Sequence, residues 1–169
     1  MADVRPTRKK IRLPQQDYSE PGAYFVTICT EKRANILWEP CPDCAHVEWH
    51  AVGANCVRPQ NLPLSILGYL VMAELEAWHK TYPAVTLAAY VIMPDHLHVM
   101  VEIHPDENGR PQVAPTVSRM VKQFKGRVSK AIGRAIWQKS FAEHVVRDPE
   151  DYARRMQYIC DNPLRWHFK

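Results

Sequence analysis

The sequence predicts a two-layer α+β domain in which helices cover a mostly antiparallel sheet. Three observations support this fold class. The chain has 169 residues, 46% hydrophobic and 24% charged, which suits one globular domain with its own core. Its segments read in the order strand, helix, strand, strand, helix, strand, helix. No apolar run reaches the roughly 18–20 residues that span a bilayer, and no signal peptide is visible, so we expect a soluble cytoplasmic protein without a membrane partner.

The first half of the chain contains an arm, a strand, an irregular stretch and a helix. Residues 1–22 are basic and then rich in Pro, Gln and Ser, and we expect an arm that precedes a single domain over 23–169. The run 24–30 is rich in aromatic and β-branched residues and predicts the first strand. Residues 31–61 predict an irregular insertion with one short strand near 47–52. Apolar residues recur at helical spacing over 63–82, which predicts a helix.

A strand hairpin and a polar loop occupy the middle of the chain. The runs 85–93 and 96–104 have the composition of strands, and Pro94 and Asp95 between them predict a turn. A polar loop with several prolines follows over 105–115. These two strands are the natural centre of the predicted sheet.

The second half of the chain predicts two helices with a strand between them. Apolar residues over 116–136 fall on one side of a helical wheel and basic residues on the other, which predicts a helix packed on the core. A short strand is expected at 141–146. Asp148 suits an N-cap and Pro149 a first helical position, and Pro163 predicts that this last helix ends at about Asn162.

Positive charge is concentrated in two segments although the net charge is only +4. Residues 1–12 carry a net charge of +4, and residues 110–139 carry +8 with no acidic residue. Two basic patches on an acidic remainder are typical of nucleic-acid binding, although a solvated helix face is the alternative. The basic residues expected to contact nucleic acid are Arg8, Lys9 and Lys10 in the arm and Arg119, Lys122, Arg127, Lys130 and Arg134 in or beside the helix.

Two histidines on one strand are the first candidate for a chemical function. His96 and His98 are two residues apart, so both point to the same face of a strand, while Leu97 and Val99 point to the other face. Two imidazoles on one face form a bidentate platform for a metal ion. The alternative is a structural pair of histidines.

The last helix supplies a second candidate. A helical wheel places Tyr152, Met156 and Ile159 on the core stripe and Tyr158 nearly opposite, with Asn162 one turn later. A tyrosine off the core face with an amide one turn later differs from a packing tyrosine and is a candidate for function, and an ordinary surface tyrosine is the alternative. Two tryptophans in the second half of the chain, Trp137 and Trp166, are interpreted as core residues, with base stacking as their alternative role.

These motifs together resemble the HUH single-tyrosine transposases, and within them the REP-associated tyrosine transposase group of the IS200-like family. The resemblance runs in order over nearly the whole chain and joins a His-hydrophobe-His motif to a Tyr-Ile-x-x-Asn-Pro motif about sixty residues later. The matching segments are Ile11–Pro14, Asp17–Ser19, Pro21–Ile28, Val91–Met100, Val121–Lys125, Trp137–Ser140, Glu143–Asp148 and Tyr158–Pro163.

The resemblance implies a role for each candidate residue. His96 and His98 correspond to the pair that binds Mg²⁺ or Mn²⁺, Asn162 to a third metal ligand, and Tyr158 to the nucleophile. It implies a ferredoxin-like or RRM-like sheet, the fold of HUH endonucleases. It also implies that single-stranded DNA with hairpins or REP-like repeats is cleaved and rejoined through a 5′-phosphotyrosine, by a bacterial, nucleoid-associated protein that acts alone or as a homodimer.

Three other functions remain as alternatives. A catalytically silent, domesticated DNA-binding protein would keep the fold and the basic patches, but it would not need a tyrosine with two histidines. An RNA-binding module of the RRM type would need paired aromatic residues on its sheet, which are not apparent. A metal-dependent hydrolase would activate water and would not need Tyr158.

The predicted insertion contains a further candidate metal site. Cys41, Cys44 and Cys56 lie close to His46 and His50, and a Cys-x-x-Cys pair with nearby histidines is suggestive of structural zinc. The spacing of the second pair is irregular, so a variable loop with free thiols is the alternative.

Overall fold

The computed structural model describes residues 21–40, 63–105 and 116–167. Three sequence predictions lie outside these ranges: the arm with Arg8, Lys9 and Lys10, the strand near 47–52, and the zinc site at Cys41, Cys44 and Cys56. Among the described residues, no helix is both long enough and apolar enough to cross a bilayer.

Four strands form a single antiparallel sheet. They are β1 (Gly22–Cys29), β2 (Val85–Ile92), β3 (His96–Ile103) and β4 (Ala142–Val146). Their order across the sheet is β2-β3-β1-β4, so β1 and β3 are central and β2 and β4 lie at the edges. This order of a β-α-β-β-α-β chain is that of ferredoxin-like folds, and the predicted α+β class with an antiparallel sheet is confirmed.

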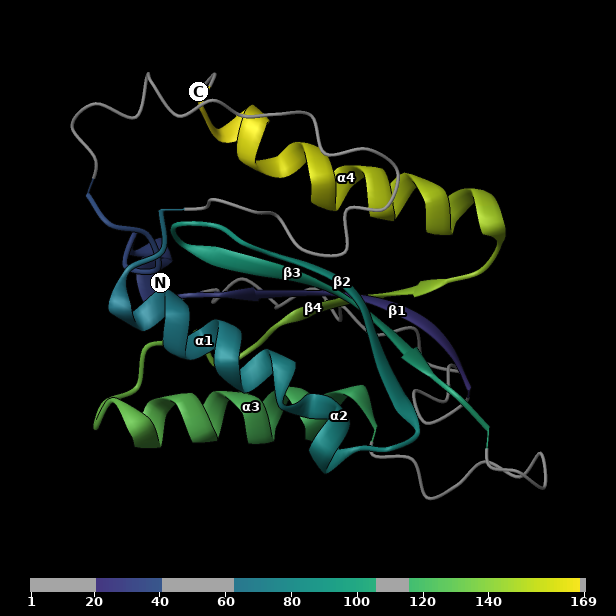
Figure 1. The fold of residues 1–169 in the computed structure, drawn as a ribbon, viewed down its shortest axis with the longest axis horizontal. Helices are drawn as coiled ribbons and strands as arrows, with labels where there is room; N and C mark the ends of the chain where they lie inside the picture. The colour runs from purple at the N-terminus through teal and green to yellow at the C-terminus, as the bar shows by residue number, and fades with distance from the viewer. Residues whose placement is uncertain (1–20, 41–62, 106–115, 168–169) are drawn as a thin grey trace, which may run out of the picture.

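Helices cover both faces of this sheet (Figure 1). Below it lie α1 (Ile66–Glu76), the single turn α2 (Trp78–Thr81) and α3 (Val117–Ala131), and above it lies α4 (Pro149–His167). A short 3-10 helix, η1 (Glu31–Arg33), follows β1. The α4 helix therefore approaches a different sheet face from the other helices.

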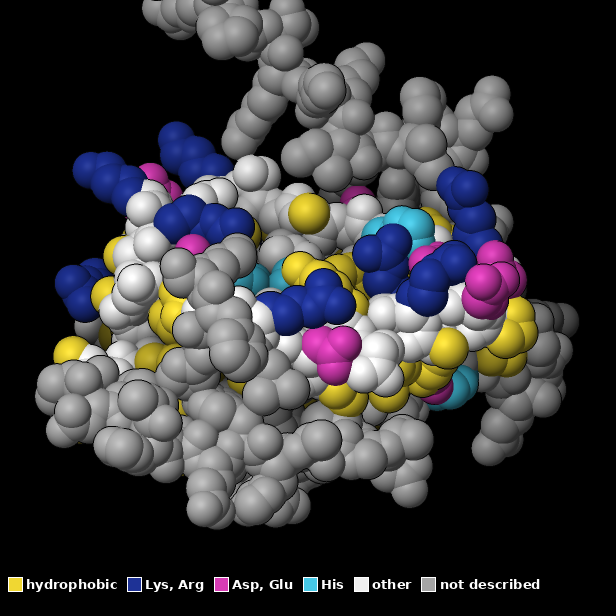
Figure 2. Space-filling view, turned by 90° about the horizontal axis from the view of Figure 1, so that it is seen from above, with side chains coloured by type: hydrophobic (Ala, Val, Ile, Leu, Met, Phe, Trp, Pro, Cys, Tyr) yellow, Lys and Arg dark blue, Asp and Glu magenta, His cyan; other side chains and the backbone are white. Residues whose placement is uncertain are grey.

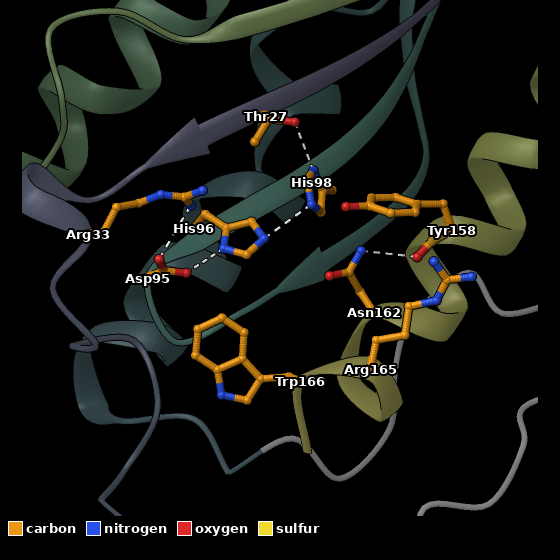
Figure 3. Close-up of a pocket in the computed structure, with 9 residues that line it drawn as sticks. All are labelled: Thr27, Arg33, Asp95, His96, His98, Tyr158, Asn162, Arg165 and Trp166. Carbon is orange, nitrogen blue, oxygen red and sulfur yellow. Dashed lines mark hydrogen bonds and ion pairs between the residues drawn. The ribbon is translucent and has the colours of Figure 1, made fainter. Parts of the chain in front are cut away.

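Side chains of β3 divide between the two layers as the period of a strand requires. Leu97, Val99 and Val101 are buried in the apolar core, on the sheet face that α1 and α3 cover. His96 and His98 point to the other face, toward Tyr158 and Trp166 of α4 (Figure 3). One strand thus supplies both the core and the candidate site.

Two helices on the core side differ in length from their predictions. Instead of one helix over 63–82, α1 begins after the N-cap Ser65, whose hydroxyl accepts a hydrogen bond from the backbone N–H of Gly68, and it is separated from α2 at Ala77. The α3 helix ends at Ala131 rather than at 136. Gly133 two residues later has φ +72°, a conformation that ends helices and that glycine adopts without steric cost.

The predicted end of the last helix at Asn162 is wrong, because α4 continues through Pro163 to His167. A proline inside a helix removes one backbone hydrogen bond and crowds the preceding turn. Here Pro163 is buried, and the turn that follows brings Trp166 against the core. Tertiary packing therefore offsets the local cost, and the extra turn becomes part of the pocket described below.

Candidate functional site

A pocket of about 250 Å³ lies between the start of β3 and the C-terminal half of α4 (Figure 3). Its residues come from β1, the loop after β1, the turn before β3, β3 itself and α4. They are Thr27, Arg33, Asp95, His96, His98, Tyr158, Asn162, Arg165 and Trp166. The four residues predicted for metal binding and catalysis are all among them.

The two histidines are held with their Nε2 atoms facing each other. The Nδ1 of His96 lies 2.5 Å from Asp95 Oδ1, and the Nδ1 of His98 lies 2.8 Å from Thr27 Oγ1. The two Nε2 atoms are 3.1 Å apart. Oriented in this way by partners on Nδ1, both rings direct their second nitrogen at one point in the pocket (Figure 3).

His98 is held in its neutral form. Burial lowers the pKa of His98 to about 3, and His96 and the Arg33 guanidinium act in the same direction. Thr27 pairs with His98 across the β1–β3 register, and its hydroxyl can either donate or accept a hydrogen bond. The neutral ring can therefore present an unprotonated Nε2 to the pocket.

The donor set fits a divalent cation. Two ligand atoms at about 2.1 Å from an ion and at a right angle to each other are about 3.0 Å apart, close to the observed separation of the two Nε2 atoms. Asn162 is buried, and its Nδ2 donates to the backbone oxygen of Tyr158 at 3.1 Å. Its amide oxygen is turned toward the histidine pair (Figure 3). Within the described part of the chain, no group of three His, Cys, Asp or Glu side chains could hold a metal, so a metal ion at this histidine pair would need the amide oxygen of Asn162 as a third protein ligand.

Tyr158 lies at the opening of the pocket and is 36% exposed. Its ring meets His98 edge-on at a centroid distance of 5.1 Å and Phe25 at 6.0 Å. Phe25 is in turn stacked on His98 at 5.1 Å, and the Arg165 guanidinium lies 5.9 Å from the Tyr158 ring. The phenol is thus fixed on three sides while its oxygen faces the pocket (Figure 3).

The turn that precedes the histidines is anchored by the loop after β1. The hydroxyl and the backbone N–H of Thr30 both donate to the backbone oxygen of Asp95, each at 2.9 Å. The Arg33 guanidinium lies 3.3 Å from the Asp95 carboxylate. Lys32 and Arg33 have φ values of 54° and 56°, a backbone conformation that costs on the order of 1 kcal/mol or more for a residue other than glycine. Such strain is maintained only by surrounding structure and is frequent at functional sites.

Four pocket residues were missed by the sequence analysis. Thr27 could have been found from the register of β1 and β3, because it lies opposite His98 on the same sheet face. Asp95 directly precedes His96, so proximity alone could have identified it. Arg165 could have been found from helical spacing, seven residues after Tyr158, but the predicted helix ended at Asn162. No sequence signal identifies Arg33, because it reaches the pocket through the segment after β1, whose course the sequence does not reveal.

The basic residues of α3 are not brought to this pocket. Arg119, Lys122, Arg127 and Lys130 are exposed on a helix that covers the opposite face of the sheet (Figure 1). Arg134 is also exposed and follows α3. Several other Lys and Arg side chains do gather on the α4 side of the molecule (Figure 2).

One basic residue of α3 has a structural role. The ammonium of Lys125 donates to the backbone oxygens of Gln138 and Ser140 at 2.9 and 2.8 Å. Burial lowers its pKa to about 8. Lys125 therefore ties α3 to the segment that leads into β4 and does not belong to the outward-facing row.

Comparisons with known proteins agree with the fold and the motifs. No protein-family model matches the chain. An uncharacterised protein of Haemophilus influenzae is 28% identical over 178 residues, which span 94% of this chain and 89% of that protein. A putative REP-associated tyrosine transposase of the same organism is 29% identical over 92 residues, about half of each protein (50% and 52%). The REP-associated tyrosine transposase of Escherichia coli is 30% identical over 78 residues, which span 46% of this chain and 43% of that protein.

A solved structure shares the fold. It is a REP-associated tyrosine transposase bound to a REP hairpin, with a TM-score of 0.57 and 19% sequence identity over 91% of this chain and 73% of that one. The structural likeness and the sequence matches point to the same group of proteins. By sequence and by fold, the chain is a distant relative of the REP-associated tyrosine transposases of the IS200-like family.

Proposed function

We propose that this protein is a metal-dependent tyrosine transposase that cleaves and rejoins single-stranded DNA at hairpin-flanked sites through a 5′-phosphotyrosine intermediate. The observation that carries the proposal is the convergence of Tyr158, His96, His98 and Asn162 in one pocket, from segments about sixty residues apart in the sequence. Neither a structural role nor simple DNA binding requires a phenol beside two imidazoles that face each other.

Tyr158 would act as the nucleophile. Its oxygen attacks the phosphorus of a phosphodiester, a new P–O bond to tyrosine forms, and the bond from phosphorus to the 3′ oxygen breaks. The phenolic proton passes to solvent, and the leaving 3′ oxygen takes up a proton from water, so the step needs neither oxidant nor ATP. A phenolate leaves more readily than an alkoxide because phenol has a pKa of about 10, so the released 3′ hydroxyl can reverse the reaction and rejoin strands.

A divalent ion would be held by the Nε2 atoms of His96 and His98 and by the side-chain oxygen of Asn162. When bound, Mg²⁺ or Mn²⁺ would withdraw charge from the anionic phosphodiester and orient it for attack. Two imidazole ligands favour Mn²⁺ over Mg²⁺, because Mg²⁺ prefers oxygen ligands. Asp95 and Thr27 would keep both imidazoles in the ligating orientation through their contacts with Nδ1.

DNA is the proposed partner. A relative of known structure is bound to a REP hairpin, and we carry this class of ligand over to the present chain. Arg33 and Arg165 supply positive charge at the pocket itself. The cations of α3 lie across the sheet from it, so we propose that they contact DNA several nucleotides away from the cleaved bond, with the basic arm as a further contact.

The test is covalent adduct formation. Labelled single-stranded DNA hairpins with unpaired flanks, drawn from a varied pool, are incubated with the protein and Mn²⁺ and resolved on a denaturing gel. We expect a labelled band shifted by the mass of the protein, absent with EDTA and absent for Tyr158→Phe. Tyr69→Phe is the matched control, because Tyr69 is an exposed tyrosine on α1, across the sheet from the pocket.

Other outcomes would contradict the proposal in different ways. Cleavage that persists in Tyr158→Phe would identify a hydrolase that activates water. DNA binding without an adduct for any hairpin of the pool would identify a silent DNA-binding protein with the same fold.

A further inference from the structure

The pocket has two sides, and different residues line them. Tyr158 lies beside His98, at a ring centroid distance of 5.1 Å. Trp166 lies beside His96 instead, at 6.3 Å, and Arg33 reaches the same histidine through Asp95. In Figure 3, Tyr158 and Arg33 stand on opposite sides of the histidine pair.

The chemistry of phosphoryl transfer gives these sides different roles. In an in-line displacement the attacking and leaving oxygens lie on opposite sides of the phosphorus. With the phosphodiester at the histidine pair and Tyr158 attacking from the His98 side, the 3′ oxygen leaves toward the His96 side. The nucleotide that carries this oxygen must therefore be accommodated near Arg33 and Trp166.

We propose that Arg33 and Trp166 form the binding subsite for the nucleotide that leaves with the 3′ hydroxyl, in which Trp166 stacks on its base and Arg33 binds the phosphate on its 5′ side. The inference rests on the proposed function, because it takes Tyr158 as the attacking group. It assigns a function to the turn of α4 beyond Pro163.

Trp166 has the properties of a stacking platform. It is half-buried, so one part of the indole packs against the core while another part lines the pocket. Its ring is tilted by 51° from that of His96 and is not stacked on it. An aromatic surface beside a phosphate-binding centre suits an unpaired base, since every base has a face on which an aromatic ring can stack.

Arg33 has the properties of a phosphate ligand. Its side chain is 52% exposed, although one end of the guanidinium is paired with Asp95. A guanidinium has five N–H donors, so donors remain for a phosphate after this pairing. Asp95, the carboxylate on this side, is buried and engaged by both Arg33 and His96, so its charge is balanced locally.

Arg165 belongs to the other side of the pocket. It lies 5.9 Å from the Tyr158 ring and is paired with Asp161 at 3.6 Å. We therefore do not include it in the subsite for the leaving nucleotide.

The test combines protein variants with DNA that lacks single groups. Adduct formation by the unaltered protein first identifies the cleaved step, and binding is then measured on short oligonucleotides in the Tyr158→Phe background. Trp166→Ala should weaken binding of intact DNA by roughly 5- to 150-fold. On DNA that lacks the base 5′ to the cut, Trp166→Ala should cause no further loss of affinity. On DNA that lacks the base 3′ to the cut, the substitution should cause the same loss of affinity as on intact DNA. Trp166→Phe should retain most of the binding.

Arg33 is tested in the same way. Arg33→Gln should weaken binding of unmodified DNA, and the loss should vanish when the phosphate 5′ of the leaving nucleotide is a neutral methylphosphonate. Lys80→Gln is the control, because Lys80 is exposed on α2, across the sheet from the pocket, and it should leave the binding of short oligonucleotides unaffected. With Tyr158→Phe as the only substitution, removal of the base 5′ to the cut should weaken binding as much as Trp166→Ala does, which tests the subsite without any change at Trp166.

The outcomes separate this inference from the proposed function. Two results would overturn the subsite alone, provided that the adduct forms. In one, the effect of Trp166→Ala on affinity depends on the base 3′ to the cut; in the other, it depends on neither base. Equal loss in Trp166→Phe and Trp166→Ala would show that Trp166 acts only by packing. Absence of any adduct would overturn the proposed function and the subsite with it.

Discussion

The two faces of β3 differ in what they bury: one face packs in the apolar core, and the other carries the candidate site. Toward α1 and α3, Leu97, Val99 and Val101 are buried among apolar side chains. Toward α4, His96 and His98 are buried beside aromatic rings and hydrogen-bonded to Asp95 and Thr27. An apolar core gains free energy from each buried side chain, whereas buried polar groups must be satisfied merely to avoid a penalty. The free energy gained on the core face therefore offsets the cost of burying polar groups on the other face.

The distribution of other buried polar residues sharpens this comparison. Asp151 and Asn162 are buried on α4, and Asp95 is buried in the turn before β3. Among the described residues of α3, the buried side chains are all apolar. A helix whose fully buried side chains are all apolar can cover a core, but a helix that also buries polar side chains can build a site.

The largest effect on folding is expected from Leu97→Ala. Leu97 is fully buried, and leucine-to-alanine substitutions in cores lower the free energy of unfolding by about 2–5 kcal/mol. Urea unfolding measures this loss, and adduct formation at low temperature should persist in the fraction that remains folded. A loss below about 1 kcal/mol would contradict the assignment of this face as the source of stability.

The next effect concerns the polar face and should change metal binding more than folding. Thr27→Val removes the partner of His98 Nδ1 while keeping the shape of the side chain. Loss of such a partner typically lowers metal affinity by about 10- to 100-fold, and we expect this shift in the Mn²⁺ concentration needed for adduct formation. Thr86→Val is the control, since Thr86 also contacts a histidine through its hydroxyl, at 2.8 Å from Nε2 of His104, away from the pocket. Equal shifts in both variants would argue against the metal site.

A smaller effect should distinguish the cations of α3 from Arg33 and Arg165 at the pocket. The double variant Lys122→Gln, Lys130→Gln should leave the affinity for a short oligonucleotide at the cleaved site unchanged, because α3 lies across the sheet from the pocket. For a long hairpin the affinity should fall, and the slope of log affinity against log salt should decrease by roughly 1.5 for two lost phosphate contacts. Unchanged binding of the long hairpin would remove α3 from the DNA path.

The smallest effect is expected in the pH dependence of stability. A hydrogen bond from His144, together with nearby Arg155, holds the pKa of Asp151 below its ordinary value of 3.8. A lowered carboxyl pKa contributes stability that is fully present above the ordinary value and is lost as pH falls through the lowered one. Unfolding of Asp151→Asn at pH 7, 4 and 3 should lack this component. Parallel pH profiles for the variant and the unaltered protein would contradict it.

Sequence patterns predicted how residues lie relative to one another where both residues belong to the same strand or helix. Alternation in a strand placed His96 and His98 on one face, and helical spacing placed Asn162 one turn after Tyr158. The order of strands and helices predicted the α+β class, which the structure confirms. Local periodicity depends only on the backbone geometry of a single strand or helix, so it can be read without knowledge of the rest of the chain.

The sequence did not predict features that depend on how one element packs against another. It predicted the end of α4 at Asn162, because the local cost of Pro163 was visible and the packing of Trp166 was not. It also did not reveal that α3 covers the opposite sheet face from the pocket, since periodicity shows that a helix has an apolar side but not which sheet face receives it.

By itself, the sequence identified the candidate residues for metal binding and catalysis and predicted which segments form strands and helices, because residue type and local spacing are properties of the chain. Only the tertiary structure decided that α4 crosses the polar face of β3, that Arg33 and Trp166 stand beside His96, and that the α3 cations point elsewhere. These placements depend on the energy of packing whole elements against one another. That energy arises from contacts between residues far apart in the chain, which no local pattern records.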